Sequence, residues 1–269
     1  MTVTTTTTTT TLAPRPPEPA RLGRPTVLAR SLRAEWTRLR SVRSTYGSLL
    51  ATVVVTVGIA ALFAWAIVAG EEPDAATATA VDLASIGIAF GQFGLLALAA
   101  LAITNEFATG SIRTTLAATP SRSAVLAAKA AVVGAVSFAG GFVATALAML
   151  AAAPILGTGT GDLLGVSARS GAALALTSLV VLGLGTVLRS TAGTITTAVA
   201  VLFAPVIVGG LVSNKIVTTV LDYLPADLAG VLSAGSGEPY GPGLAALVLG
   251  AWAVAALAAG VLALHRRDS

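Results

Sequence analysis

The sequence contains no cysteine, a single histidine and few charged residues. Only 10% of its 269 residues are Asp, Glu, Lys or Arg, whereas an average soluble domain carries about 25%. Without cysteine the chain can form no disulfide, no thiolate nucleophile and no Cys-ligated zinc site. The one histidine, His265, lies close to the C-terminus, where a buried Ser-His pair is not expected. The shortage of charge excludes an ordinary soluble globular protein.

Apolar residues make up 55% of the chain. Six stretches contain no charged residue, and about 20 apolar residues are enough for a helix to cross the hydrocarbon core of a bilayer. A membrane β-barrel would instead need alternating segments of about 10 residues. We therefore predict an all-α polytopic membrane protein with six transmembrane helices, over residues 46–69, 83–104, 130–151, 171–188, 191–212 and 243–264.

Positive charge is distributed unevenly around these stretches. With a cytoplasmic N-terminus, 14 of the 16 Lys and Arg residues lie on the cytoplasmic side, and only Arg169 and Lys215 lie outside. Because Lys and Arg accumulate in cytoplasmic loops, both termini are predicted to be cytoplasmic. The basic residues flank apolar runs and lack interleaved aromatic residues, so the expected partner is the lipid bilayer and not nucleic acid.

Two different segments precede the first span. Residues 1–26 contain a threonine tract and five prolines, which is typical of a disordered tail. Residues 27–43 place apolar side chains at helical spacing and arginines on the other side, which predicts an amphipathic helix in the membrane interface. The candidate residues on this helix are Glu35, Trp36 and Arg40. Residues 44–267 then form the six-span domain.

Two connections are longer than geometry requires, at 105–123 on the cytoplasmic side and 213–242 on the external side. The external connection contains two short apolar groups separated by Pro225. A pair of short helices dipping back toward the bilayer and an ordered external cap are both compatible with it. In the second span, Gly87 and Gly91 form a G-x-x-x-G pattern, which is a possible contact between two protomers.

The sequence contains no G-x-x-x-x-G-K-[ST], so the chain is not expected to bind ATP through a phosphate-binding loop. No catalytic residue, cofactor or metal site is predicted, and the chain is not expected to be an enzyme. An intramembrane hydrolase is disfavoured because no His, Asp or Lys lies in a predicted span to activate a nucleophile.

The most informative segment is 105–122. Thr104 or Asn105 is expected to cap a short helix, with Glu106 in its first turn. The order of residues resembles the pattern E-[FY]-x-x-G-[ST]-x-[RK]-x-x-L-x-x-x-P-x-R, which lies between the second and third spans of ABC-2 type transporter permeases. Each defined position is matched, by Glu106, Phe107, Gly110, Ser111, Arg113, Leu116, Pro120 and Arg122.

The resemblance extends over roughly residues 27–267. It implies a permease subunit that pairs with a second permease, identical or different, and with a separate ATP-binding subunit. Segment 105–123 would couple to that ATPase, and the last external loop would form short re-entrant helices. The expected activity is efflux of a hydrophobic or amphipathic cargo across the cell membrane, and an Arg to Lys ratio of 14:2 resembles that of a GC-rich bacterium. The alternative is a non-transporting membrane anchor or immunity component that recruits a cytoplasmic partner.

Overall fold

The computed structural model describes residues 24–70, 78–118, 121–211, 214–237 and 239–267. The predicted tail therefore lies outside the described residues, except for 24–26, which form the first turn of helix α1 (Arg24–Ser41). Pro25 suits this position because the first amides of a helix have no intrahelical partner.

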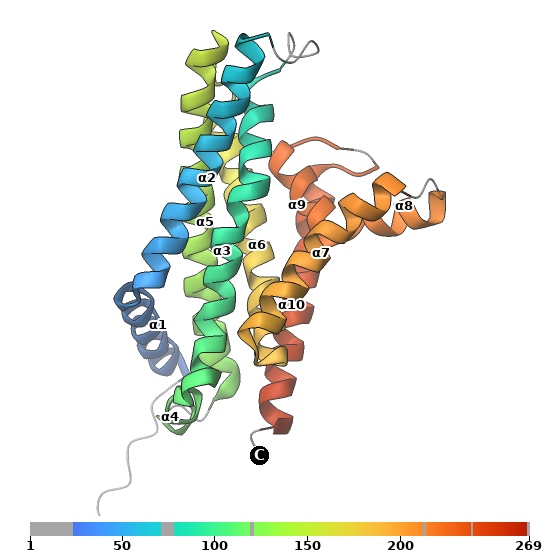
Figure 1. Cartoon of the computed structure of the whole chain (residues 1–269). Helices are drawn as coiled ribbons and strands as arrows, with labels where there is room; N and C mark the ends of the chain where they lie inside the picture. Colours follow the sequence, from blue (N-terminus) through green and yellow to red (C-terminus); the bar gives the residue numbers. More distant parts are fainter. Residues whose placement is uncertain (1–23, 71–77, 119–120, 212–213, 238, 268–269) are drawn as a thin grey trace, which may run out of the picture.

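Every regular element in the described ranges is a helix (Figure 1). Six of the helices are long and apolar enough to cross a membrane, which confirms the number that the uncharged stretches predict. They are α2 (Arg43–Val68), α3 (Ala80–Thr109), α5 (Arg122–Leu156), α6 (Leu163–Leu188), α7 (Thr191–Leu211) and α10 (Pro242–Arg267).

Helices α3 and α5 are longer than their uncharged stretches, with 30 and 35 residues. At 1.5 Å per residue they are about 45 Å and 52 Å long, more than the hydrocarbon thickness of about 30 Å. Residues 105–109 belong to α3, and 122 onward belong to α5, so segment 105–123 is only partly a loop. Between them lies the short helix α4 (Ser111–Ala118).

The expected helix start at Thr104 or Asn105 is wrong. The Thr104 hydroxyl donates to the Ala100 carbonyl at 2.9 Å, a bond within α3, and does not cap a new helix. Helix α3 instead ends at Gly110, whose left-handed conformation (φ 69°) closes it. Glu106 consequently lies in the last turns of a long helix and not in the first turn of a short one.

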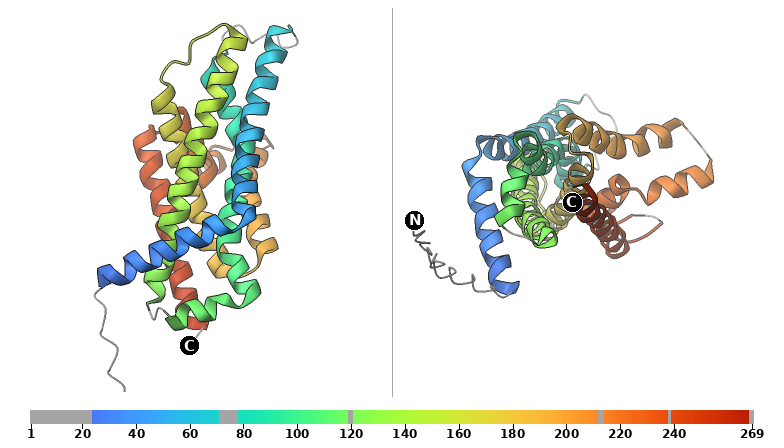
Figure 2. Two further views of the ribbon diagram at one scale, coloured as in Figure 1. Left: turned by 90° about the vertical axis from the view of Figure 1, so that its left-hand side faces the viewer. Right: turned by 90° about the horizontal axis from the view of Figure 1, so that it is seen from below.

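Helix α1 crosses the end of the bundle at which α4 is found (Figure 2). It is separated from α2 by Val42, whose backbone is extended (φ −92°, ψ 120°) and so breaks the helical path. Helix α1 then packs against α5, with Leu39 buried in the main apolar core. We call this end of the bundle the α4 end.

Helices α2 and α3 pack closely through small residues. A side chain at Gly87 would overlap the backbone carbonyl of Thr56 on α2, and one at Gly91 would overlap the Thr56 hydroxyl. The G-x-x-x-G pattern therefore forms a contact within one chain, which corrects its assignment as a contact between protomers. The physical reason is that a neighbouring helix of the same chain already occupies the space that the glycines leave.

The connection between α7 and α10 contains two short helices, α8 (Lys215–Asp222) and α9 (Pro225–Ala234). The axes of the two helices are bent by 66° relative to each other. Neither helix alone is long enough to cross a membrane, but the two together are long and apolar enough to form a seventh, broken span. Helix α9 packs on α6 and α10 through Leu228 and Leu232, whereas α7 and α8 lean away from the bundle (Figure 1).

Candidate functional site

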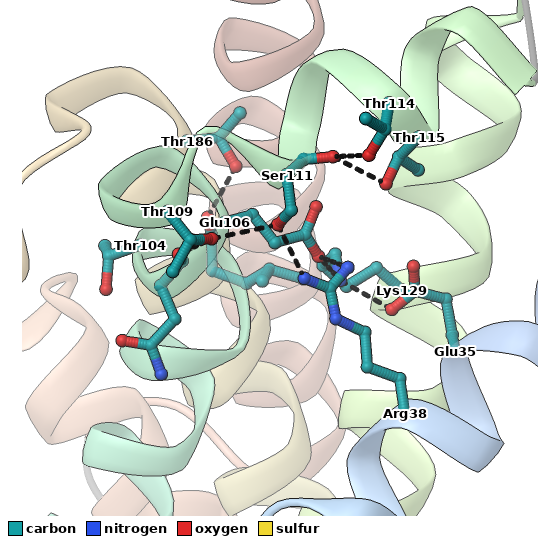
Figure 3. Close-up of polar contacts among 12 residues, drawn as sticks. Glu35, Arg38, Thr104, Glu106, Thr109, Ser111, Thr114, Thr115, Lys129 and Thr186 are labelled. Carbon is teal, nitrogen blue, oxygen red and sulfur yellow. Dashed lines mark hydrogen bonds and ion pairs between the residues drawn. The ribbon is translucent and has the colours of Figure 1, made fainter.

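Four charged side chains meet at the α4 end of the bundle (Figure 3). Glu35 and Arg38 are three residues apart on α1, which places them on one face of that helix. Glu106 comes from the end of α3, and Lys129 from the third turn of α5. We call these four residues the ion cluster. Three elements far apart in the sequence are thus joined by charge at one point.

The two cations and two anions of the ion cluster are in direct contact. Lys129 Nζ lies 2.5 Å from Glu35 Oε2 and also pairs with Glu106 Oε1. Arg38 Nη1 lies 2.6 Å from the same Glu106 oxygen. Lys129 therefore bridges α1 and α3 from its position on α5, and Arg38 forms a second link between α1 and α3.

The ion cluster is largely withdrawn from the surface. Glu106 is 1% exposed, Lys129 2% and Glu35 6%, while Arg38 is half-buried. Burying an ion is costly unless it is paired, and here two positive and two negative charges balance. Removing one partner of such a buried pair costs about 3–5 kcal/mol, because the remaining charge is left uncompensated. The ion cluster consequently favours one arrangement of α1, α3 and α5 over others.

Hydrogen bonds extend the ion cluster to α4. Arg38 Nη2 donates to Ser111 Oγ at 3.0 Å, and Thr109 Oγ1 donates to the same oxygen at 3.0 Å (Figure 3). Ser111 is the first residue of α4 and directly follows Gly110. The start of α4 is therefore connected through Arg38 to Glu106 and, beyond it, to Lys129.

Two other residues of the segment, Phe107 and Arg122, contact the ends of α6 and α10. The Arg189 guanidinium at the end of α6 lies 4.9 Å above the Phe107 ring, a cation-π arrangement. Arg122 Nη1 donates to the carbonyl of Leu264 near the end of α10. A cation near the last carbonyls of a helix also interacts favourably with the helix dipole. Arg122 thus links the start of α5 to the end of α10 within the chain.

A pocket of about 150 Å³ is lined by all four residues of the ion cluster and by further residues of α1, α2 and α3. Leu39, Leu98 and Leu101 form part of its apolar wall, and Asn105 and Thr109 contribute polar groups. Glu106 Oε2 has no hydrogen-bond partner among the described residues.

Of the remaining predicted residues, Trp36 and Arg40 lie on the surface of this end. Trp36 is 46% exposed on α1, with the exposed Arg40 guanidinium 5.9 Å from its ring. Arg113 and Leu116 lie on α4, but their side chains are not among those described. Pro120 lies outside the described residues. The structure thus brings Glu35 and Glu106 together and leaves Trp36 and Arg40 on the surface.

Sequence reasoning missed Arg38 and Lys129 as members of a site. One signal could have indicated them: Glu35 falls within the apolar stripe of α1, near the angular positions of Leu28, Leu32 and Leu39. An acid in the middle of an apolar face requires a cationic partner when that face is buried. Lys129, the one lysine near the predicted spans on that side, was the natural candidate.

Comparison of the sequence with known protein families finds no family that matches it, and comparison with curated proteins finds no similar protein. Within the described ranges, no group of three or more His, Asp or Glu side chains is placed to hold a metal ion. The geometry shows that the ion cluster links α1 to the long helices α3 and α5.

Proposed function

We propose that this chain is the membrane-spanning subunit of an ATP-driven exporter, with ATP hydrolysed by a separate partner at the α4 end. The observation that carries the proposal is the connection of α4 to α1, α3 and α5 through Ser111, Arg38, Glu106 and Lys129. Two of these residues, Glu106 and Ser111, belong to the segment whose residue order resembles that of ABC-2 type permeases. The resemblance supplies the identity of the partner, and the ion cluster supplies a route for force.

In this proposal the α4 end faces the cytoplasm of a bacterial cell and α1 lies in the membrane interface. The charge asymmetry of the loops supports that orientation. The exposed Trp36 and Arg40 support the position of α1, because such side chains favour the level of the lipid headgroups. The ATPase would bind α4, which is placed beyond the ends of α3 and α5 (Figure 1).

Force on α4 would reach α3 directly across Gly110 and would reach α5 through Arg38, Glu106 and Lys129. Because α3 and α5 extend through the whole bundle, a shift at their ends would be transmitted to the opposite face. A second permease subunit, identical or different, would complete the cargo path, since a single bundle of closely packed helices leaves little space for one.

The proposal is tested by purifying the tagged chain from the membranes of the cell that produces it. We expect a protein with a Walker A sequence to co-purify, together with ATP hydrolysis. Thr114 is exposed on α4, and Ser236 is exposed in the connection that follows α9. Thr114→Arg and Ser236→Arg therefore form a matched pair of surface substitutions. Thr114→Arg should release the ATPase and Ser236→Arg should retain it. Co-purification of a partner without an ATP-binding sequence would overturn the proposal and favour a membrane anchor.

A further inference from the structure

A second pocket, of about 160 Å³, lies between α3, α6 and α9. Gln92, the last of its lining residues on α3, is 14 positions before Glu106, which corresponds to about 21 Å along the helix. The pocket therefore belongs to the half of the bundle remote from the ion cluster. Most of its wall is made of alanine, leucine, isoleucine and glycine, and its polar side chains are Ser85, Gln92, Ser170 and Ser233.

Two of these polar side chains are already satisfied. Ser85 Oγ donates to the Val81 carbonyl and Ser233 Oγ donates to the Gly230 carbonyl, each at 2.9 Å. These bonds stay within their own helices, so neither serine needs a further partner.

The other two side chains keep unused hydrogen-bonding capacity. Gln92 Nε2 donates to the Ala89 carbonyl at 2.8 Å, but its side-chain oxygen accepts no hydrogen bond from the part of the chain that is described. Ser170 is 2% exposed, and its hydroxyl has no hydrogen-bond partner within the same ranges. Buried polar groups in proteins are normally hydrogen-bonded, so an unpartnered hydroxyl beside an open pocket indicates a place for a ligand group.

The chemistry of the wall restricts what can bind. None of the residues that line the pocket is ionisable, and transfer of an isolated ion into such a site is strongly unfavourable. The ligand group must therefore be uncharged. An apolar cavity of about 150 Å³ accommodates a molecule the size of benzene, so a volume of about 160 Å³ suits a single ring or a short branched chain.

We propose that this pocket binds the uncharged, hydroxyl-bearing end of an amphipathic molecule. The ligand hydroxyl donates to the side-chain oxygen of Gln92 and accepts a hydrogen bond from the Ser170 hydroxyl, while its ring or chain lies against the alanines of α3 and α9. The identification of this molecule as exported cargo rests on the proposed function. The binding itself does not.

The test uses 4-fluorobenzyl alcohol as the probe and the full chain in phosphatidylcholine nanodiscs, with binding followed by the fluorine NMR signal. 4-Fluorotoluene lacks the hydroxyl and 4-fluorobenzylammonium carries a charge, so the three probes differ only at one group. We expect saturable binding of the alcohol, roughly fivefold weaker binding of the toluene, and no binding of the ammonium compound.

Variants then locate the binding. Gln92→Leu and Ser170→Ala should each weaken binding of the alcohol roughly fivefold, and Ala229→Leu should abolish it by filling the pocket. Ser178→Ala is the matched control, because Ser178 is equally buried on α6 but does not line the pocket. Its binding should equal that of the unmodified chain.

The proposal is overturned if the alcohol shows no saturable binding, or if Gln92→Leu, Ser170→Ala and Ala229→Leu bind it as well as Ser178→Ala does. Neither result would alter the co-purification of an ATPase, which is measured without the probe. Conversely, if no ATPase co-purified with the chain but the alcohol still bound, the pocket would be a binding site without a role in transport.

Discussion

Lys129 on α5 and Glu35 on α1 form an ion pair of 2.5 Å although 94 residues separate them in the sequence. Both side chains are buried, and Lys129 makes a second pair with Glu106. Lysine is a compact, strongly hydrated cation on a flexible stem, so it remains buried only where acids surround its ammonium group. The position of α1 at the end of the bundle therefore depends on a charge that α5 supplies.

Replacement of Lys129 by Met should destabilise the fold strongly. The substitution keeps a similar volume but leaves Glu35 and Glu106 buried without their shared cation, at a cost of about 3–5 kcal/mol. Unfolding by denaturant in detergent measures this cost. Arg33→Gln, which removes an exposed arginine from α1, should change stability by less than about 0.5 kcal/mol.

A triple variant separates lost pairing from lost packing. When Glu35→Gln and Glu106→Gln are added to Lys129→Met, the charge left in the ion cluster is that of Arg38, whose side chain is 38% exposed and can be hydrated, so much of the lost stability should return. If the single Lys129→Met variant is as stable as the Arg33→Gln variant, the ion cluster does not hold α1 in place.

The number of membrane-crossing helices could be predicted from the sequence because the cost of burying charge in hydrocarbon leaves a direct trace in composition. Each of the six helices coincides with one of the uncharged stretches over all or nearly all of that stretch. Helix ends were less predictable. Helix α3 continues past Thr104 because its polar residues there bond within the helix or to α1, and a hydropathy pattern contains no information about either contact.

The partners of individual residues were the least predictable feature. The spacing of Gly87 and Gly91 correctly indicates close helix packing, but the same pattern serves a neighbour in the same chain or in a second one. Only the three-dimensional arrangement identifies α2 as that neighbour. Arg122 illustrates the same difficulty, because a basic residue beside a span can point outward or, as here, can bind the end of α10.

Substitution at Gly91 should disrupt the packing of α2 on α3. A methyl group there would overlap the hydroxyl of Thr56 and approach the Thr52 carbonyl, so Gly91→Ala should cost about 1–3 kcal/mol. Gly58 on α2 is the matched control, since a side chain there meets nothing within 4 Å and Gly58→Ala should not destabilise the fold. Equal stability of the two variants in thermal unfolding would contradict the close contact.

The proposed orientation can be checked with single cysteines, because the native chain contains none. Thr114 on α4 and Ser236 after α9 are both exposed. An impermeant thiol reagent applied to intact cells should label Ser236→Cys and spare Thr114→Cys, and permeabilised cells should show both labelled. Labelling of Thr114→Cys in intact cells would reverse the orientation.

Alkaline pH should weaken the contacts around Tyr240, which precedes α10. Burial, followed by the nearby charges of Asp227 and Asp222, raises the pKa of Tyr240 from 10.0 to about 12. As the pH rises, the unfolded chain loses this proton before the folded chain does, so stability falls between pH 10 and pH 12. Comparison of unfolding across this range should show a smaller fall for Tyr240→Phe than for Tyr46→Phe, which alters an exposed tyrosine on α2. If stability fell equally in the two variants, Tyr240 would not be the cause of the loss of stability at alkaline pH.

The joint between α3 and α4 provides the sharpest test of the proposed coupling. Gly110 ends α3 with φ 69°, and Gly157 ends α5 with φ 67°, each with no neighbour within 4 Å of a potential side chain. A valine in this left-handed conformation is strained at either position, by about 1–2 kcal/mol or more. The two substitutions should therefore cost similar stability, although they lie at opposite ends of the bundle.

Their effects on coupling should differ, because only Gly110 sets the direction of α4 relative to Ser111 and the ion cluster. In the complex with its ATPase partner, Gly110→Val should lower cargo-stimulated ATP hydrolysis several-fold while the partner remains bound. Gly157→Val should keep the stimulation of the unmodified complex. If both variants lose stimulation equally, the loss follows from reduced stability alone; if neither does, α4 is an ordinary connection and the route from α4 through Arg38 to Glu106 carries no force.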